Sequence, residues 1–556
     1  MAVPPWVGYD AVIMPILVRN IPLGLDESEE ALVPAVARRL SVPVEAIRSY
    51  AIVRRSLDAR RKDIHFSYHL EVALDEPLQK EQQRLRRLPS ASVAWIENAH
   101  QMEPSPGNHS MPERPIIIGF GPAGMFAALR LAEHGYNPIV LERGRDVRRR
   151  HRDVLQRYFR QREFDPESNV LFGEGGAGTY SDGKVYTRVN DPLCRTVLET
   201  LYHHGADPNI LVDARPHIGS DKLPTICSRI RRKIESLGGE IRFESLVDDI
   251  RVTDGALTAI HVRSRQEASC TGWMGCGPVV LAVGHSARDT IRMLVTRGVR
   301  VEPKPFQIGV RIEHPQEMVD SWQYGTLAGH GRLSPAEYWL VAKGAGGDHG
   351  NMFSFCMCPG GRILPTNHAP GLIATNGASL ARRSHPFANS GLVITLNPNA
   401  IGLSPQQALD YQERWEKQAY AVTGESYRVP CQRANDYLVR RASEGDIATS
   451  YPLGGCWTEI RSIIPTSVAE ALDRGLPALD RKFPGFAGRA ALITGPETRA
   501  SSPIRLLRNT ETREAVDVAD LYPTGEGAGY AGGIISAAVD GIRTADAIIT
   551  RYAPPA

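Results

Sequence analysis

Residues 115–144, PIIIGFGPAGMFAALRLAEHGYNPIVLERG, constrain the fold of this chain more than any other stretch. They begin with a short apolar run at 116–118, and a G-x-G-x-x-G turn follows directly at 119–124. An apolar helical stripe over 125–132 and a second apolar run ending at Glu142 complete the pattern. This order predicts a full β-α-β unit, and therefore an α/β fold with parallel strands.

Each part of this unit has a role in binding a dinucleotide. Gly119 permits the tight turn, Gly121 lets the backbone approach a pyrophosphate, and Gly124 allows close helix packing. The helix N-terminus supplies amide donors and a partial positive charge. Glu142 lies where an acid accepts hydrogen bonds from ribose hydroxyls. We therefore expect cofactor contacts from Gly119, Gly121, Pro122, Ala123, Gly124, Glu142 and Arg143.

The same glycine spacing occurs twice more, in GEGGAG at 173–178 and in GEGAGYAGG at 525–533. GEGGAG is followed by TYSDGKVYT, which reads as a turn and then a strand, so no helix is expected there. The last loop does precede an amphipathic helix, whose apolar face comprises Ile535, Ala538, Val539, Ile542 and Ile549. The sequence then ends too soon for another strand and acid, so a second nucleotide fold is not expected.

The length of 556 residues, 42% of them hydrophobic, indicates two or three domains. Residues 1–98 have the order β-α-β-β-α of a ferredoxin-like α+β unit, and the polar, Pro-containing stretch 99–113 reads as a linker. We expect the first part of the cofactor domain at 114–300, a substrate or cap domain at 301–490, and a closing part of the cofactor domain at 491–556.

The bulk features exclude several classes of protein. No run of eighteen apolar residues and no secretory leader pattern is present, so a soluble cytoplasmic protein without a membrane partner is expected. Eight irregularly spaced cysteines make neither a disulfide framework nor a zinc site, and we expect no bound metal. A net charge of +3 is too small to indicate nucleic acid.

Nine arginines between Arg143 and Arg162 leave one partner question open. A helix this basic suits RNA, an anionic membrane or an acidic carrier. The alternative is a solvated face with pairs such as Asp146 and Arg150, and we favour it. Nucleic acid is therefore not expected as a partner, and the oligomeric state is not predicted.

Several long motifs carry a resemblance to a known family: ESNVLFGEGGAGTYSDGK, KPFQIGVRIEHPQ, FCMCPGG, ETRASSPIR and YPTGEGAGYAGGIISAAVDGIR. Together they resemble a poorly characterised family of bacterial FAD-dependent dehydrogenases, within the glutathione-reductase-like flavoproteins. The resemblance covers almost the whole chain. It implies a Rossmann-like FAD-binding domain of glutathione-reductase type with an inserted substrate domain and the small N-terminal domain.

The resemblance also implies further FAD contacts. In such flavoproteins a glycine-rich loop at the start of the last long helix completes the FAD site, which here gives Gly525, Glu526, Gly533 and Ile534. The strand ending at Gly284 resembles the mid-chain strand beside the FAD, and the backbone near Val247 resembles the segment that faces the adenine.

The middle glycine loop is a further candidate for the cofactor site. Backbone amides of Gly176, Ala177 and Gly178 can contact phosphate or ring oxygens without steric cost, and Lys184 would favour negative charge on a reduced flavin. A solvated surface lysine is the equally weighted alternative for Lys184.

Candidate catalytic residues come from three other motifs. Cys356 and Cys358 share a strand face and could relay electrons, although buried free thiols are the favoured interpretation. Arg311 and Glu313 also share a face and could pair with each other or bind a carboxylate. A salt-bridge network between domains is at least as consistent with the residues concerned: Arg311, Glu313, His314, Glu497, Arg499 and Arg505.

We expect a FAD-dependent dehydrogenase or reductase that transfers a hydride between flavin and a small organic molecule. With one dinucleotide fold, NAD(P)H would visit the flavin only transiently. A flavin monooxygenase and an RNA-modifying flavoprotein remain alternatives. The sequence AVGHSARD lacks the aspartate of the aromatic-hydroxylase signature, which argues against the monooxygenase.

Overall fold

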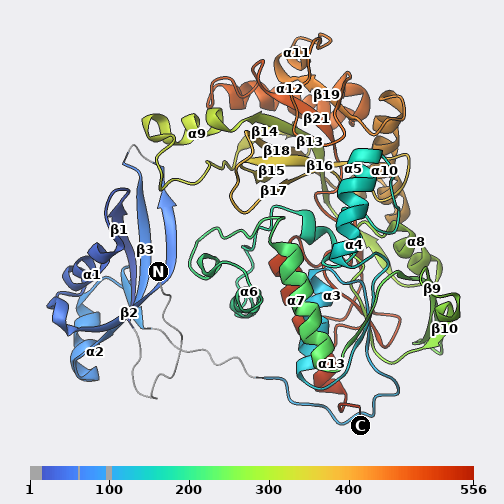
Figure 1. Cartoon of the computed structure of the whole chain (residues 1–556), viewed down its shortest axis with the longest axis horizontal. Helices are drawn as coiled ribbons and strands as arrows, with labels where there is room; N and C mark the ends of the chain where they lie inside the picture. Colours follow the sequence, from blue (N-terminus) through green and yellow to red (C-terminus); the bar gives the residue numbers. More distant parts are fainter. Residues whose placement is uncertain (1–15, 61–62, 96–102, 556) are drawn as a thin grey trace.

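The computed structural model describes residues 16–60, 63–95 and 103–555. Residues 1–15, where no secretory leader was expected, and the first part of the expected linker, up to residue 102, lie outside these ranges. The N-terminal unit stands apart from the rest of the chain in Figure 1. Its elements are β1 (Ile16–Gly24), α1 (Leu32–Leu40), β2 (Ile47–Asp58), β3 (His65–Leu74), α2 (Leu78–Arg87) and β4 (Val93–Trp95).

The four strands of this unit form an antiparallel sheet in the order β2-β3-β1-β4. Alternate residues of the strands point to one face, where α1 covers them with Leu32, Val36 and Leu40. The sequence pattern missed β4, which has only three residues. With β4 included, the order becomes β-α-β-β-α-β, the split arrangement that antiparallel sheets of this size adopt.

A five-stranded parallel sheet forms the second unit, in the order β23-β11-β5-β6-β7. Its strands are short and buried at the centre: β5 (Ile116–Ile118), β6 (Ile139–Leu141), β7 (Glu240–Arg242), β11 (Val279–Leu281) and β23 (Leu521–Pro523). One face of the sheet carries α3 (Pro122–Glu133), α7 (Leu223–Ser236) and α13 (Ile534–Arg551). The predicted β-α-β unit is therefore present, together with a parallel partner from the last part of the chain.

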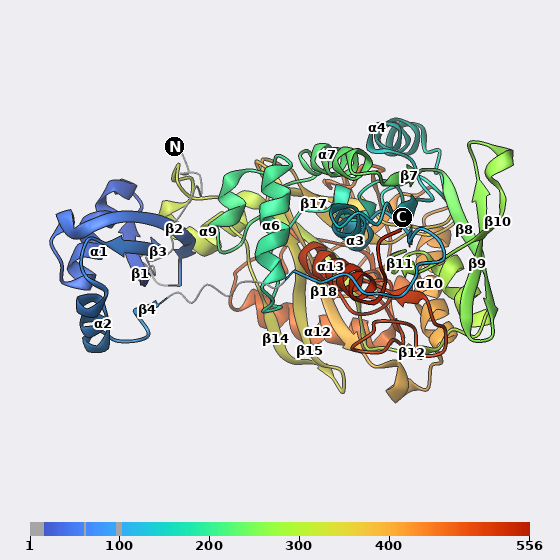
Figure 2. The same ribbon diagram turned by 90° about the horizontal axis from the view of Figure 1, so that it is seen from below.

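The opposite face of this sheet packs on a three-stranded antiparallel sheet. Its strands, β8 (Ser245–Thr253), β9 (Ala256–Ser264) and β10 (Gly272–Gly275), lie at the end of the molecule farthest from the N-terminal unit (Figure 2). β5 shows the division within one strand: Ile117 packs toward α3, whereas Ile116 and Ile118 pack toward β8 and β9.

The third unit contains a seven-stranded mixed sheet in the order β14-β15-β18-β13-β21-β19-β20. The strands are β13 (Phe306–Pro315), β14 (Val341–Gly347), β15 (Gly350–Cys358), β18 (Phe387–Leu396), β19 (Val429–Arg433), β20 (Gly455–Trp457) and β21 (Leu492–Glu497). The predicted boundary at residue 490 is wrong, because β21 pairs with β13 and β19 inside this sheet. The unit therefore extends beyond Glu497.

The N-terminal unit contacts the body through its long strand β2. The backbone N–H of Arg55 donates to Val212 O at 2.7 Å, and Arg55 O accepts from Ala214 N at 2.8 Å. The Arg55 side chain also pairs with Asp213 at 2.8 Å. These contacts hold segment 212–214 as a short extension of the N-terminal sheet.

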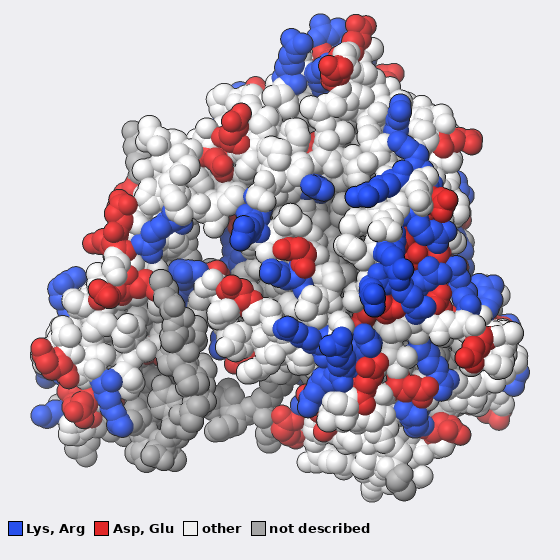
Figure 3. Space-filling model, in the orientation of Figure 1, with Lys and Arg blue, Asp and Glu red and all other residues white. Residues whose placement is uncertain are grey.

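The arginine-rich segment connects the second and third units. It forms α4 (Val147–Arg152), a π-helical turn (Asp153–Tyr158) and α5 (Phe159–Gln161). Tyr158 packs against Ile363 and Val429 of the third unit and donates its hydroxyl to Asn367 Oδ1 at 2.8 Å. Figure 3 shows basic side chains gathered over α4 and α7, so part of the segment does form a solvated face.

The expected pair of Asp146 with Arg150 is wrong in detail. Asp146 caps α4 by accepting from the backbone N–H groups of Arg148 and Arg149, and its ion pair is with Arg149. Arg150 points inward and is completely buried. Within the described ranges, no helix has the length and apolar character needed to cross a membrane, and no cluster of His, Cys, Asp or Glu fits a metal ion.

Candidate functional site

The first glycine loop joins β5 to α3 and leaves an open space at the helix N-terminus. Gly119 has φ +96°, and a Cβ there would lie 2.5 Å from Ala282 O. A Cβ on Gly124 would lie 2.0 Å from Gly119 O, so both positions require glycine. Gly121 differs, because its nearest neighbour would be the Cα of Gly176 at 3.8 Å. The first turn of α3 has no side-chain cap, so its N–H groups are available to an anion.

Glu142, at the end of β6, binds the first two glycine loops together. Its buried carboxylate accepts backbone N–H groups from Phe120 and Gly144 at 2.8 Å and from Gly173 at 2.9 Å. A carboxylate accepts about four hydrogen bonds, so capacity remains for a ribose hydroxyl. Nearby, Val247 packs against Ile118 and Leu141.

The second glycine loop lies directly against the first. Gly175 N donates to Phe120 O at 2.8 Å, and a Cβ on Gly176 would lie 2.9 Å from the Cα of Gly121. The expectation that no helix follows is wrong, because Gly176–Tyr180 form the 3-10 helix η4. Positive φ values at Gly175 and Gly176 let the chain turn into it.

The buried side chain of Arg150 fixes the backbone of this second loop through hydrogen bonds. Its guanidinium donates to the carbonyl oxygens of Asn169, Val170, Glu174 and Gly176 at 2.7–2.9 Å. The neighbouring Arg143, expected at the cofactor, pairs with Glu167 and Asp289 and stacks over the Phe172 ring. The arginine run therefore builds the walls of the site.

The third glycine loop, between β23 and α13, closes over α3. A Cβ on Gly525 would lie 2.7 Å from Ala123 Cβ, and one on Gly527 would lie 2.6 Å from Gly284. Asp540 of α13 anchors the loop by accepting the N–H of Gly525 at 2.7 Å while it pairs with Arg508 and Arg513. These cations hold the pKa of Asp540 below its ordinary value against the effect of burial.

The second loop thus meets Gly121 and the third meets Ala123, so all three loops lie together at the N-terminus of α3. Like α3, α13 begins without a side-chain cap, and Cβ atoms on Gly532 and Gly533 would meet nothing within 4 Å. A Cβ on Gly178, in the second loop, would lie 3.6 Å from Ile534 at the start of α13. Uncapped helix N-termini and open glycines suit a pyrophosphate, so the residues present fit a dinucleotide such as FAD.

Glu526 does not stand alone in the third loop. Its carboxylate lies 3.3 Å from His285 Nδ1, and both side chains are partly exposed. The sequence analysis missed His285, although it directly follows Gly284. An acid and an imidazole therefore flank the place where Gly284 meets Gly527.

The predicted pair of Arg311 and Glu313 does not form, although both residues lie on β13. Arg311 is fully buried and binds Glu497 of β21 through two hydrogen bonds of 2.9 and 3.0 Å. Glu313 accepts from the backbone N–H and the hydroxyl of Ser450, and burial raises its pKa to about 7. His314 is bonded to Phe486 O at 2.8 Å, and burial lowers its pKa to about 4.

Arg499 belongs to a buried network between the second and third units. It donates to Ser286 Oγ at 2.9 Å and to Glu416 at 2.7 Å. Glu416, from α10 (Pro405–Val422), also lies 3.5 Å from Arg288 of α8 (Arg288–Thr296). The salt-bridge alternative therefore holds for Arg499. Arg505, by contrast, is exposed and stacks on Tyr530.

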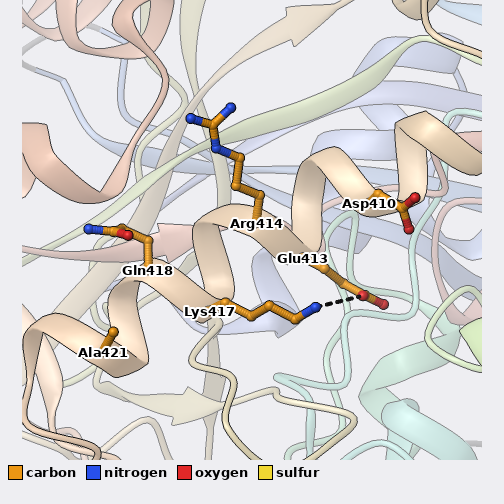
Figure 4. A pocket seen from close by; sticks show the side chains of 6 residues that line it. All are labelled: Asp410, Glu413, Arg414, Lys417, Gln418 and Ala421. Atoms are coloured by element: carbon orange, nitrogen blue, oxygen red, sulfur yellow. Dashed lines mark ion pairs between the residues drawn. The ribbon is translucent and has the colours of Figure 1, made fainter.

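A hollow on the outer side of α10 adjoins this network through Glu413, whose carboxylate lies 3.4 Å from Arg288. Figure 4 shows its lining, with Lys417 reaching toward Glu413. All the lining residues come from the same helix: Asp410, Glu413, Arg414, Lys417, Gln418 and Ala421. It contains no residue of the three glycine loops.

Lys184 is not a surface residue. Its Nζ donates to Met357 O and lies 3.3 Å from Asp182, which is buried. Met357 stands between the two candidate cysteines on β15. The structure thus brings Lys184, Arg311, Cys356 and Cys358 together.

Comparison with known proteins places the chain in a family. It is 40% identical over 546 residues to an uncharacterized protein of Clostridium beijerinckii, covering 98% of this chain and 100% of that protein. The chain belongs to the family of this clostridial protein. Residues 305–500, which form most of the third unit, match the model "FAD-dependent protein, C-terminal domain-like". Residues 15–73 match a domain of unknown function (DUF8436).

Solved structures with more distant likeness were also found. L-amino acid deaminase from Proteus myxofaciens is 11% identical, with 81% of this chain and 93% of that chain covered and a TM-score of 0.33. Glycine oxidase from Geobacillus kaustophilus is 11% identical, with 79% and 95% covered and a TM-score of 0.33.

The 305–500 match agrees with the structural boundary after β21. Within this family domain, Arg311 and Glu497 form the pair that joins its central strands. Sequence spacing could not reveal this pair, because its two residues are far apart along the chain. Asp182 and Asp540 lie inside two of the quoted motifs, but their roles depend on Lys184, Arg508 and Arg513 lying close to them in the fold, which the motifs do not record.

Proposed function

We propose that this protein binds one FAD and acts as an oxidoreductase, a dehydrogenase or reductase, on a small organic molecule. The convergence of three glycine loops at the uncapped N-terminus of α3 carries the proposal. The family match of residues 305–500 supports FAD as the dinucleotide. NAD(P)H would act as a transient electron donor or acceptor.

The residues of the first loop would hold the pyrophosphate. The first turn of α3 has no side-chain cap, so its N–H groups can bind the phosphates, and the helix dipole favours their negative charge. Glu142 would bind the adenosine ribose through its remaining acceptor capacity. The N-terminus of α13 would face the flavin end of the cofactor.

When bound, the flavin supplies two-electron transfer with a substrate, chemistry that amino-acid side chains do not provide. The protein then has to orient the substrate and hold protons. Glu526 and His285 face each other at 3.3 Å and can share a proton next to the Gly284–Gly527 contact. Lys184 supplies a buried positive charge on the side of the second loop.

Cofactor retention tests the site. Gly121→Asp places a carboxylate against the pyrophosphate in a position where the apoprotein has room for it. The variant should purify folded but colourless, whereas the wild type should carry one FAD per chain. Gly331→Asp is the matched control, because its Cβ also meets no neighbour within 4 Å. A Gly121→Asp protein with full FAD content would refute the assignment.

Anaerobic reduction tests the reaction class. A candidate substrate that bleaches the yellow protein by itself supports a dehydrogenase. Bleaching by NADPH, followed by oxygen-dependent recovery only when substrate is present, would instead favour a monooxygenase.

All eight cysteines are free thiols, which supports our proposal of a reducing compartment, the cytoplasm.

A further inference from the structure

Cys356 and Cys358 lie where β15 departs from regular geometry. The register with β18 shifts between Phe355 and Cys358, and Cys356 has φ +45°. Cys356 is partly exposed, whereas Cys358 is completely buried. The Cys358 thiol donates to the backbone oxygen of Cys356 at 3.4 Å. The pair therefore combines a partly exposed residue with a buried one two positions along the same strand.

Two cations contact the backbone of this pair from different directions. Lys184, on the segment after η4, donates to Met357 O between the cysteines. Arg311, from β13, donates through Nη1 to Cys356 O at 3.3 Å. Each cation also has a carboxylate partner, Asp182 for Lys184 and Glu497 for Arg311.

A third cation leaves this cluster with a surplus positive charge. Arg383 is mostly buried, and its nearest carboxylate is Asp182 at 3.7 Å, which Lys184 already shares. Glu337 lies farther from Arg383, at 3.9 Å, and forms a 2.8 Å pair with Arg215. With Arg215 and Glu337 included, four cations thus face three carboxylates. An uncompensated buried charge is costly, so a further anion is favoured here.

Cys356 is the group that can supply this anion. Other titratable groups facing the cluster stay neutral, because burial raises the pKa of Tyr186 to about 12 and lowers the pKa of His217. Burial also raises the pKa of Tyr338, and the Cys358 pKa is raised through its bond to Cys356. The Cys358 hydrogen bond, with Lys184 and Arg311, lowers the Cys356 pKa to about 6.

We propose that Cys356 and Cys358 form a thiol–disulfide exchange centre whose substrate is a small disulfide. Cys356 thiolate attacks one sulfur of the substrate disulfide, breaks its S–S bond and releases the first thiolate. Cys358 then loses its proton and attacks the Cys356 sulfur, which releases the second substrate thiolate. The chain holds a new disulfide, and the substrate has become two thiols after the released thiolates take up protons.

Turnover of this centre rests on the proposed FAD function. Reduced flavin, as FADH⁻, would return the Cys356–Cys358 disulfide to one thiolate and one thiol and become FAD. The two electrons and the single hydrogen balance in this step. The exchange itself needs only the two cysteines, so it can be measured separately from the cofactor.

The test uses 4,4′-dithiodipyridine as the disulfide, with thiopyridone release followed by absorbance at pH 6. Wild type should release two thiopyridones per chain in a fast phase, and mass spectrometry should find a Cys356–Cys358 disulfide. Cys358→Ser should release one and keep a mixed disulfide on Cys356. In the wild type, the fast phase should be about tenfold faster than the reaction of an ordinary thiol at this pH. Cys356→Ser should lose this phase.

Two further variants separate charge from folding. Lys184→Met should lose the fast phase at pH 6 and recover it at pH 9, whereas Lys184→Arg should keep it at pH 6. Cys270→Ser is the matched control, because Cys270 is exposed but lies 3.6 Å from the Glu267 carboxylate; its removal should leave the fast phase unchanged. A fast phase that survives Cys356→Ser, or two thiopyridones from Cys358→Ser, would overturn the proposal.

FAD content of the same samples keeps the two proposals distinguishable. A fast phase in protein without FAD supports the exchange centre and removes the proposed flavin function. Full FAD content without a fast phase supports the flavin function and removes the exchange centre. In protein with both, anaerobically reduced flavin should be reoxidised by one equivalent of the disulfide in the wild type but not in Cys356→Ser.

Discussion

Gly121 and Gly176 face each other across the candidate cofactor site, so closely that a Cβ on Gly176 would lie 2.9 Å from the Cα of Gly121. This contact brings the β5–α3 turn and the second glycine loop into one surface. Both glycines are backbone-only positions, which is what close approach to a phosphate requires. Several expected outcomes follow from this geometry and from the groups that support it.

Gly176→Ala should release the FAD. The new Cβ meets Gly121, and φ +59° at this position is strained for alanine, so the second loop must move away from α3. The ratio of flavin to protein absorbance after gel filtration measures the effect. Gly255→Ala is the control, since φ there is +75° and its Cβ meets nothing within 4 Å. Equal FAD content in the two variants would contradict the expectation.

Arg150→Met should destabilise the protein by at least about 2 kcal/mol, because it leaves several buried carbonyl oxygens without a donor. Thermal unfolding, followed by circular dichroism, measures the change. Arg152→Met removes an exposed arginine from the same helix and should have little effect. If both variants melt together with the wild type, Arg150 does not support the second loop.

Asp540→Asn should weaken FAD binding about tenfold, which corresponds to about 1.4 kcal/mol. The neutral amide loses the ion pairs with Arg508 and Arg513, so the Gly525 turn is held less firmly. Titration of apoprotein with FAD, read by flavin fluorescence, gives the affinity. Asp546→Asn changes the same helix at its contact with Arg130 and should bind FAD normally. If Asp546→Asn weakened FAD binding more than Asp540→Asn, Asp540 would not be the residue that anchors the third glycine loop.

Arg311→Met and Glu497→Gln should each cost about 3–5 kcal/mol of stability, because either change leaves its partner charged and buried. The double variant should cost clearly less than the sum. Denaturant unfolding of the four proteins in a double-mutant cycle measures the coupling. Strict additivity would show that the two groups do not depend on each other.

Glu313→Gln should gain stability relative to the wild type as pH rises. The folded pKa of Glu313, about 7, lies above its ordinary value of 4.5, so its stabilising contribution is complete below pH 4.5 and is lost toward pH 7. Glutamine has no such loss, and the difference between pH 5 and pH 8 should be on the order of 2 kcal/mol. The opposite pH effect of His314, lost as pH falls from 6.5 to about 4, is common to both proteins. A pH-independent difference in melting would refute the assignment.

Local sequence was enough to predict the β-α-β unit and the helix after the last glycine loop. In both, the whole pattern lies within a few turns of chain, and all five predicted apolar residues of α13 are buried. The 3-10 helix after Gly175 was missed because glycines adopt it through positive φ values that no side-chain pattern records.

The alternation of residues along one strand could not predict which residues pair across neighbouring strands of the sheet. The face shared by Arg311 and Glu313 was read correctly as a strand pattern, but the choice of partner depended on β21 lying beside β13. Lys184 was undecided for the same reason, since its burial comes from β15, which is distant in sequence.

The third glycine loop has a consequence for how the protein is made. β23 joins the parallel sheet beside β11, and only then can Gly525 settle on Ala123. The ribosome synthesises Gly119 early and Gly533 late. During synthesis, the proposed cofactor site therefore lacks the third glycine loop. We therefore expect the cofactor to bind only after the last part of the chain has been made, and a chain truncated before β23 to retain no FAD even when flavin is supplied in excess.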